Sequence, residues 1–378
     1  VAETGRWRPM GPDGPALDVA VFGEDGQEPQ NPGPYVHVAQ GTTVALTMRN
    51  ALASTLTVHG LCDRPAARCD PIAVPAGETR EARFTLSAAG TFAYWGSTTP
   101  RAVSSRLRQD TQLNGAIVVS PPGRDGTGGV LLLSTYRDPP AAGPCLGDDA
   151  TAVFAINGAS WPHTTRQRYA AGDTVRWRVV NLTCEQHAMH LHGFHFSVTA
   201  AGDGVTDTPL EGDAARTGVT EAVAPGRTFA LTWVPTRAGN WLFHCHMVPH
   251  MSAPAGQAHA AHGSDPGAGM AGLVVGIEVT GPPADAAAVE TGPIKRLTLS
   301  LHEDPARYGA AKGYRMEVEG VDAPRLDAGP VPGPVILTQR GQPTEITVVN
   351  RMTEPAAMHW HGMELESYFD GVPGFGGT

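Results

Sequence analysis

The sequence predicts an all-β protein made of consecutive Greek-key sandwiches or barrels, and three observations lead to this prediction. The 378 residues include 46 Gly and 33 Pro, which lie between short apolar runs, where the turns of a β protein are expected. Apolar and polar residues alternate through many of these runs, as they do in half-buried strands. One strand plan also recurs along the chain, while helical periodicity is weak throughout.

Composition and charge exclude several classes of protein. Apolar residues make up 41% of the chain and charged residues 17%, which suits packed cores and argues against a disordered chain. The net charge is −10, and Lys295 and Lys312 are the only lysines. An acidic chain without a basic stripe is a poor candidate for binding nucleic acid or anionic membranes. No apolar run approaches the roughly 18 residues of a spanning helix, so we expect a soluble protein without a membrane span.

Two runs of turn-forming residues, 121–129 and 281–288, divide the chain. They predict three segments, 1–122, 130–280 and 294–378, of which the first two have the size of ordinary domains and the third is short. In each segment a Gly turn is followed by a strand that ends in Asn and then by a strand that contains His. The first two segments also share a second half, in which residues 89–95 match residues 238–244. We therefore expect each segment to follow the same β plan.

The cysteines indicate an oxidising compartment. Cys245 belongs to a metal motif described below, which leaves four cysteines, an even number. Cys62 and Cys69 bracket a short loop and are the easiest pair, and a Cys145–Cys184 pair follows by elimination, with free buried thiols as the alternative. The first residue is Val, so the chain looks like a processed or trimmed product. We expect an exported protein, either periplasmic or extracellular.

The run from His244 to His250 carries the most chemical information. On a strand His244 and His246 share one face while Cys245 points the other way. A thiolate with two imidazoles and a weak axial thioether is the ligand set of a mononuclear blue copper, and His250 and His187 are the obvious imidazoles. Cys245 could thus bind one metal while its neighbours bind a second site behind it, which gives a short covalent path for electrons.

Two further pairs of histidines share a strand face, His190 with His192 and His359 with His361. Any single His-x-His is a weak signal, because two such side chains can simply be solvated on an exposed strand. Three pairs, of which one is built around a Cys, form a strong signal for metal binding.

These three runs, at residues 187–193, 244–250 and 359–362, resemble the copper motifs of multicopper oxidases, a family that includes laccases, ascorbate oxidase and ceruloplasmin. The resemblance covers all three segments and implies cupredoxin-like domains. The second would hold type 1 copper and half of a trinuclear site, and the third would be the start of a domain, apparently truncated. Residue by residue, the resemblance implies a type 1 copper on His187, Cys245 and His250, a type 2 copper on His190 and His359, and a binuclear type 3 copper on His192, His244, His246 and His361.

The resemblance also assigns a role to Asp370, which resembles the family's acidic residue near the type 2 copper. There it would orient a bound water or relay protons. The alternative is a turn-forming Asp-Gly. The axial ligand of the type 1 site is open: the family often places Met five residues after the second type 1 His, but that position is Ala255. Met270 is favoured, because residues 269–275 look like the usual continuation displaced by an insertion; Met251 is second and no axial thioether third.

The chain also departs from the family pattern. The first segment has Thr57-Val58-His59-Gly60 where a copper-bearing domain would show His-x-His-Gly, and Trp95-Gly96-Ser97 in place of His-Cys-His, so it is expected to lack copper ligands. The six histidines of the two deeper sites are two fewer than the family's trinuclear site uses. Either a further pair lies past Thr378 or the cluster is incomplete.

The resemblance implies an oxidase that couples one-electron oxidation of a donor to reduction of oxygen to water. The donor would be a phenol, an aromatic amine or a metal ion such as Cu(I), Fe(II) or Mn(II). One alternative is copper nitrite reductase, a family that places a ligand His on only one side of the copper Cys. The other is a copper-binding electron-transfer protein without a working trinuclear cluster. The sequence leaves the oligomeric state open.

Overall fold

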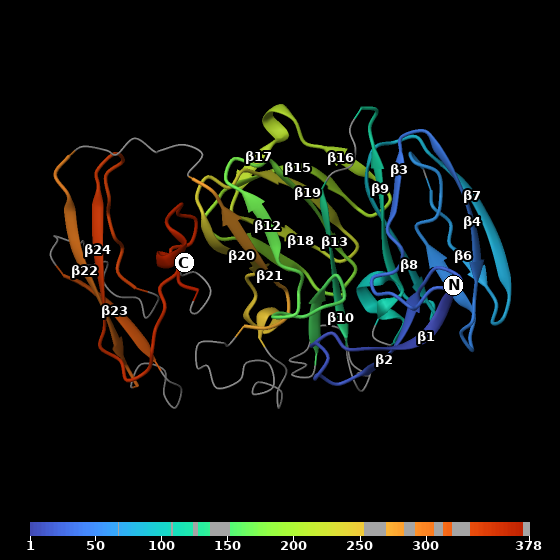
Figure 1. Ribbon diagram of the computed structural model, residues 1–378, viewed down its shortest axis with the longest axis horizontal. Coiled ribbons are helices and arrows are strands. Elements are labelled where there is room, and N and C mark those ends of the chain that lie inside the picture. The colour runs from blue at the N-terminus through green and yellow to red at the C-terminus, as the bar shows by residue number, and fades with distance from the viewer. Residues whose placement is uncertain are drawn as a thin grey trace. The chain divides into compact units, whose positions relative to one another are not determined.

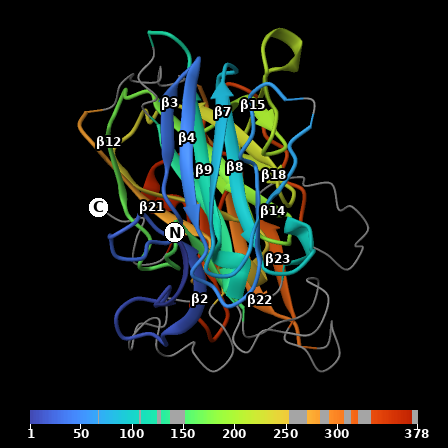
Figure 2. The ribbon, with the colours of Figure 1, turned by 90° about the vertical axis from the view of Figure 1, so that its right-hand side faces the viewer.

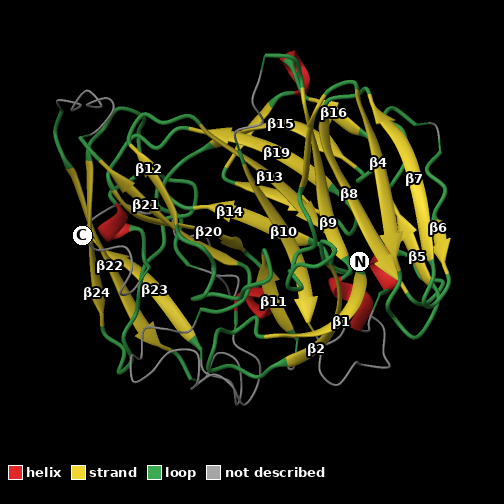
Figure 3. Ribbon diagram, turned by 45° about the vertical axis from the view of Figure 1, so that its right-hand side comes forward, coloured by secondary structure: helices red, strands yellow, loops and turns green. Residues whose placement is uncertain are grey.

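The computed structural model describes residues 1–66, 68–106, 109–123, 128–136, 152–252, 270–282, 292–305, 313–319 and 333–372. These residues form strands joined by turns and five short 3-10 helices, without an α-helix among them (Figure 3). The prediction of an all-β protein is confirmed. None of the described helices has the length and apolar character needed to cross a membrane.

The chain divides into two compact units. Unit 1 comprises Val1–Ala284 and His359–Thr378, and unit 2 comprises Asp285–Met358. Unit 1 holds two β-sandwiches, which we call the first sandwich (strands β1 to β9) and the second sandwich (strands β10 to β21). The 3-10 helices are η1 Val103–Ser105, η2 Gln109–Gln112, η3 Gly212–Ala214, η4 Val248–Met251 and η5 Ser367–Phe369.

The first sandwich packs a five-stranded sheet, ordered β3-β9-β8-β5-β6, against the pair β4-β7 (Figures 1 and 2). The strands are β3 Val36–Ala39, β4 Thr42–Arg49, β5 Leu56–His59, β6 Ile72–Val74, β7 Thr79–Leu86, β8 Gly90–Ser97 and β9 Asn114–Ser120. An antiparallel pair, β1 Ala2–Trp7 with β2 Leu17–Phe22, precedes them. Inward-facing side chains such as Leu56, Phe84 and Phe92 fill the space between the two sheets.

The second sandwich has two larger sheets, β11-β10-β13-β19-β15-β16, with β17 on β15, and β12-β21-β20-β14-β18. The strands of the first sheet are β10 Gly129–Tyr136, β11 Val153–Ile156, β13 Val175–Asn181, β15 Phe196–Gly202, β16 Asp207–Pro209, β17 Arg216–Gly218 and β19 Thr228–Trp233. Those of the second are β12 Gln167–Ala170, β14 His187–Leu191, β18 Thr220–Val223, β20 Gly239–Cys245 and β21 Val274–Thr280. Aromatic rings hold the sheets together: Trp177 lies 5.5 Å from Trp233 and 5.0 Å from Phe243 between ring centres.

Unit 2 contains a three-stranded sheet ordered β23-β22-β24. Its strands are β22 Lys295–Glu303, β23 Tyr314–Glu319 and β24 Thr344–Asn350. Leu297, Leu299 and Leu301 alternate along β22 and are buried. The three-domain division at 1–122, 130–280 and 294–378 stays a prediction.

The Asn that ends a strand in each repeat has one structural role. Asn50, Asn181 and Asn350 each donate an Nδ2–H to the carbonyl oxygen four residues later, at 2.8 to 2.9 Å. Each also accepts, through Oδ1, the backbone N–H two residues later. The side chain therefore closes the loop after the strand in the same way three times, which is the Asx turn that favours Asn at this position.

Strand pairing gives a different correspondence between the two sandwiches from the one that the sequence motifs give. In the first sandwich His59 pairs with Trp95, and in the second His190 pairs with His244. His59 therefore occupies the place of His190, whereas the motif alignment set it against His192. Gly96 stands where the second sandwich has its Cys, and a Cβ there would lie about 3 Å from Leu56, Phe22 and Leu113. Apolar side chains thus fill this part of the first sandwich.

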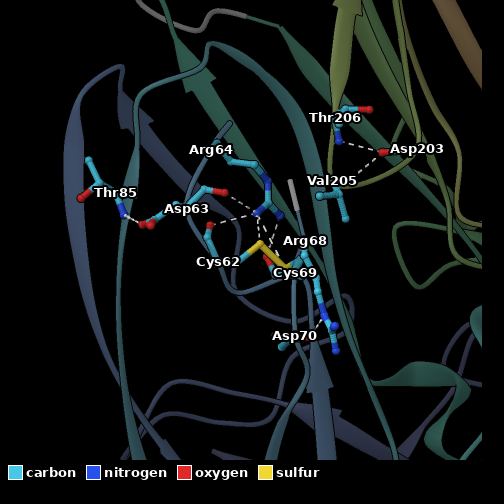
Figure 4. The surroundings of a disulfide bond; sticks show 11 residues. Cys62, Asp63, Arg64, Arg68, Cys69, Asp70, Thr85, Asp203, Val205 and Thr206 are labelled. Carbon is cyan, nitrogen blue, oxygen red and sulfur yellow. Dashed lines mark hydrogen bonds and ion pairs between the residues drawn. A yellow bond between two sulfur atoms is a disulfide. The ribbon is translucent and has the colours of Figure 1, made fainter. Parts of the chain in front are cut away.

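A disulfide joins Cys62 to Cys69, as predicted. Figure 4 shows that the loop between them turns the Arg64 side chain inward. The guanidinium donates to the carbonyl oxygens of Cys62 at 2.9 Å and of Gly60 at 2.8 Å. Cys184 is also disulfide-bonded. Its predicted partner, Cys145, lies outside the described residues.

Candidate metal centres

The first candidate centre consists of His187, Cys245 and His250, which we call the thiolate cluster. His187 begins β14, Cys245 ends β20 and His250 lies in η4, and all three side chains are buried. Cys245 Sγ is 3.8 Å from His187 Nδ1 and 3.5 Å from His250 Nδ1, and the two Nδ1 atoms are 2.9 Å apart. One sulfur and two imidazole nitrogens thus converge, which is the donor set of a blue copper site.

Two side chains of the loop between β13 and β14 determine which imidazole nitrogen faces the sulfur. Thr183 Oγ1 lies 2.7 Å from His187 Nε2 and 2.8 Å from Asn181 Oδ1, an atom that can only accept. The hydroxyl therefore donates to Asn181 and accepts from His187 Nε2–H. His250 Nε2 lies 2.8 Å from the Glu185 carboxylate and likewise donates to it. His187 then directs its Nδ1 lone pair toward the sulfur, and His250 does so once it has released its Nδ1 proton, as metal binding requires.

The surroundings of the thiolate cluster are apolar and aromatic. The Phe154 ring lies 4.4 Å from the His250 ring and 5.8 Å from the His187 ring. Cys245 belongs to the main core of the second sandwich. Met251 and Met270 are partly buried and pack against Leu242 and Val274. The assignment of Met270 as the axial ligand stays a prediction.

The second candidate centre, which we call the histidine cluster, contains six imidazoles: His190, His192, His244, His246, His359 and His361. The Nε2 atoms of His192 and His244 are 2.9 Å apart, and those of His190 and His359 are 3.2 Å apart. The His361 ring stacks 4.1 Å from His190 and lies 4.8 Å from His246. The chain thus brings together the histidines that the sequence assigned to the deeper copper sites; their individual roles stay predictions.

Hydrogen bonds fix the tautomers of four members of the histidine cluster. Each Nδ1 has an oxygen partner that can only accept: Val219 O for His190, Asp370 Oδ2 for His192, Cys245 O for His244 and Asp370 O for His359. The proton therefore sits on Nδ1, and each Nε2 presents a lone pair. Lone pairs that face each other at 2.9 to 3.2 Å repel, and a cation bound between them removes this repulsion. Imidazole donors suit copper, so both clusters fit the metal.

Burial keeps most of these imidazoles neutral. It lowers the pKa of His187 and His190 well below the usual value, and neighbouring imidazoles add to the effect. Burial, with the nearby His192, lowers the pKa of His244 to about 3. His250 is the exception, because hydrogen bonds to Cys245 and Glu185 outweigh its burial and raise its pKa to about 9. At neutral pH His187, His190 and His244 are therefore unprotonated, as metal binding requires.

The lowered pKa values predict that acid destabilises the metal-free protein. As the pH falls below about 6.5, histidines of the unfolded chain bind protons, whereas the buried imidazoles of the folded protein stay neutral. The free energy of unfolding therefore decreases. His250 has the opposite effect, because its raised pKa stabilises the folded protein. This stabilisation is fully present below about pH 6.5 and is lost only as the pH rises toward the raised pKa. A change in stability below about pH 6.5 therefore does not come from His250. We expect the urea midpoint of metal-free protein to fall between about pH 6.5 and pH 5. A constant midpoint would show that these imidazoles are not buried as described.

The segment that carries His359 and Asp370 is docked on the second sandwich. Glu364 lies 3.0 Å from His195, and Ser367 is buried against Gly239, at the start of β20. Figure 1 shows the C-terminal segment, in red, beside β20 and β21. Gly239 has φ +144°, and a Cβ there would overlap Ser367 Oγ. The absence of a side chain at residue 239 therefore permits the docking.

We expect Gly239→Ala to displace this segment and lower the metal content of the histidine cluster, in addition to backbone strain of about 1–3 kcal/mol. Gly77→Ala is the matched control, because Gly77 also has positive φ, +75°, but nothing lies within 4 Å of its Cβ position. Metal analysis and chemical unfolding of both variants separate the two effects. Equal metal content in both variants would contradict the prediction.

These observations define a protein of the cupredoxin fold in which a cluster of one cysteine and two histidines lies beside a cluster of six histidines. Comparison with known proteins agrees: residues 138–256, and residues 25–124 with 326–377, match two family descriptions of multicopper oxidases. The chain belongs to the multicopper oxidase family.

The similarity to individual curated relatives extends over short stretches of sequence. Laccase-9 of Arabidopsis thaliana is 42% identical over 77 residues, which are 18% of this chain and 13% of that protein. The chain spans 13% to 27% of the length of the first curated relatives it matches. The blue copper oxidase from Nitrosomonas europaea is similar in structure, with a TM-score of 0.57, 23% identity, and 74% of this chain and 84% of that chain covered. Copper nitrite reductase from the same organism has a TM-score of 0.53, 18% identity, and 75% and 92% covered.

Sequence reasoning missed the residues that orient the ligands. Thr183 and Glu185 lie in a connecting loop, and Val219 acts through its backbone oxygen, so none belongs to a His or Cys motif. One sequence feature could have indicated them: Thr183 and Glu185 lie between Asn181, which ends a strand, and the candidate ligand His187.

Proposed function

We propose that this protein is an oxidase that couples one-electron oxidation of a donor to the reduction of oxygen to water. The observation that carries the proposal is the sharing of one chain segment by both clusters. Cys245 Sγ faces the thiolate cluster, while the neighbouring His244 directs its Nε2 into the histidine cluster and donates its Nδ1–H to Cys245 O at 2.8 Å. Adjacent residues therefore connect the two centres, as transfer of electrons from one to the other requires.

Copper, when bound, supplies the one-electron chemistry and the binding of oxygen. We assign type 1 copper to the thiolate cluster, with Met270 as the proposed axial ligand, and type 2 and type 3 copper to the histidine cluster, divided as the family resemblance implies. Thr183 and Glu185 orient the imidazoles of the thiolate cluster. Asp370 is buried and its carboxylate accepts the Nδ1–H of His192, so it is placed to accept or deliver a proton beside the cluster.

The donor and the location of the protein belong to the same proposal. We propose a phenol, an aromatic amine or a reduced metal ion as the donor. The Cys62–Cys69 disulfide supports an exported protein, because disulfides persist in oxidising compartments.

Oxygen consumption tests this function. Copper-loaded protein is mixed with a phenol, an aromatic amine, Cu(I), Fe(II) or Mn(II) in an oxygen electrode, with metal-free protein as the control. We expect at least one donor to drive oxygen uptake, with four donor electrons used per oxygen. Copper-loaded protein that accepts electrons but consumes no oxygen with any donor would instead be an electron carrier.

Copper nitrite reductase remains the second candidate, because that enzyme from Nitrosomonas europaea shares the fold. The surroundings of Cys245 favour the oxidase, since His244 and His246 both contribute rings to the histidine cluster. Anaerobic incubation with nitrite and a reduced donor distinguishes the two functions. Formation of nitric oxide in this incubation, together with no oxygen uptake in the electrode assay, would support the reductase and contradict the proposal.

A further inference from the structure

A buried arginine of the first sandwich reaches the loop that orients the thiolate cluster. Arg106 follows η1 and its side chain is only 2% exposed. The guanidinium donates through NH2 to Leu182 O at 3.0 Å, and Leu182 is the first residue of the loop between β13 and β14. Thr183, the next residue, accepts the Nε2–H of the ligand His187. Arg106 and Thr183 also line the same small cavity, of about 10 Å³. The arginine therefore anchors the residue directly before Thr183, whose hydroxyl sets the tautomer of His187.

The other contacts of Arg106 hold it firmly in the first sandwich. It donates to Asn114 Oδ1 at 2.6 Å and to the carbonyl oxygens of Gly96, Asp110 and Leu113 at 3.0 to 3.3 Å. Its guanidinium also lies 5.0 Å from the centre of the Trp95 ring. Trp95 and Gly96 occupy the positions that His244 and Cys245 have in the second sandwich. In the first sandwich, the residues at these two positions therefore contact the Arg106 guanidinium.

The positive charge of Arg106 is unusual because no carboxylate oxygen accepts from it among the described residues. The Asp110 carboxylate instead accepts from the backbone N–H of Thr98 at 2.8 Å. Burial lowers the pKa of Arg106 to about 10, against the opposing effect of Asp110, so the group stays charged at neutral pH. Buried charges normally bond directly to an opposite charge, and one that bonds only to neutral oxygens is retained against a desolvation cost. This points to a use for the charge beyond packing.

We propose that Arg106 is a positioning residue for the thiolate cluster: it fixes the loop at residues 182–186, so that His187 keeps its proton on Nε2, and its charge favours the reduced form of the metal held by Cys245. Reduction removes one positive charge from the site, so a fixed cation nearby stabilises the reduced form. The copper-free sandwich thereby tunes the copper-bearing one. The effect on the metal rests on the proposed function, while the effect on the His187 tautomer does not.

Arg64 supplies a matched control within the same sandwich. It is 1% exposed, burial lowers its pKa to about 10, and it lies 5.0 Å from the ring centre of Phe92. Its backbone acceptors belong to residues 60–63 of its own loop. Arg64→Gln therefore removes an equally buried guanidinium that does not contact the loop at residues 182–186.

The proposal is tested by two measurements on each of three variants, Arg106→Gln, Arg106→Lys and Arg64→Gln. Nitrogen-15 NMR of the metal-free protein reports which nitrogen of His187 carries the proton. Titration of the copper-loaded protein with ferrocyanide–ferricyanide mixtures reports its reduction potential. We expect Arg106→Gln to give His187 a mixture of tautomers and to shift the metal toward the oxidised form by roughly three- to tenfold at a fixed potential. Arg106→Lys keeps the charge and should restore most of the potential, but not the tautomer.

The outcomes separate the proposal from a general loss of stability. Wild-type values in Arg64→Gln, alongside the changes in Arg106→Gln, support the positioning role. If Arg106→Gln keeps both the tautomer and the potential of the wild type, or if Arg64→Gln changes them equally, the proposal is overturned. If Arg106→Gln does not fold, the tautomer in Arg106→Lys decides. If the wild type shows no copper–thiolate absorption, the proposed function fails, and the tautomer of the metal-free variants still decides the role of Arg106.

Discussion

Replacing Cys245 by Ser is expected to abolish the visible absorption of the copper-loaded protein and its oxidase activity. Cys245 is fully buried and supplies the thiolate sulfur that lies with His187 and His250 in the thiolate cluster. A serine hydroxyl has nearly the same shape but is a poor ligand for this kind of copper, which depends on a thiolate. The loss of activity should exceed the roughly 100-fold cost of removing a group that only orients a ligand. Absorption spectra and oxygen uptake measure both effects.

The control for this variant is Met189→Leu. Met189 pairs with Cys245 across the neighbouring strand and is fully buried, so the substitution perturbs the same part of the core without removing a proposed ligand. Met189→Leu should keep the absorption and most of the activity. If Cys245→Ser retains the absorption, Cys245 does not bind the copper.

Replacing Asp370 by Ala is expected to lower activity by about 10- to 100-fold, the usual cost of removing a group that orients metal ligands. Asp370 is 1% exposed, accepts from His192 Nδ1 at 2.8 Å, and has Oδ1 at 3.2 Å from His359 Nδ1. Without the carboxylate, His192 loses the partner that fixes its tautomer, and a proton-accepting group disappears from the site. The absorption of the thiolate cluster should stay unchanged. Steady-state kinetics and absorption spectra check both statements.

Glu364→Gln is the matched control for Asp370. It removes a carboxylate from the same docked segment, but Glu364 is exposed and pairs with His195 rather than with the histidine cluster. Surface pairs of this kind contribute little, so this variant should retain activity. Equal losses in the two variants would indicate that Asp370 acts only by docking the segment.

The fold and the grouping of the candidate ligands were accessible from the sequence because both leave local patterns. Alternating strands between Gly and Pro turns predict the β architecture. The strand spacing of His244, Cys245 and His246 places their side chains on opposite faces without any knowledge of the third dimension. The Cys62–Cys69 pair was accessible for the same reason, since a short loop brings the two residues together.

Other features depend on contacts between segments far apart in the chain. Arg106 reaches Leu182 across the two sandwiches, and its acceptors are backbone oxygens, which every residue has. The place of His59 follows from its pairing with Trp95, which the motif does not reveal. The packing of Met270 against Leu242 and Val274 likewise joins segments far apart in the chain, and its role as the axial ligand stays a prediction. Local spacing alone cannot determine such placements.

We propose that β20 joins two copper centres, and the copper content of the wild type and of Cys245→Ser tests this most directly. Metal analysis would be combined with electron paramagnetic resonance and absorption spectra on the same samples. We predict that the wild type binds at least two coppers per chain, and that Cys245→Ser loses the thiolate signal together with about one copper and keeps the rest. A wild type with a single copper that disappears entirely in Cys245→Ser would contradict the account, because the histidine cluster would then hold no copper.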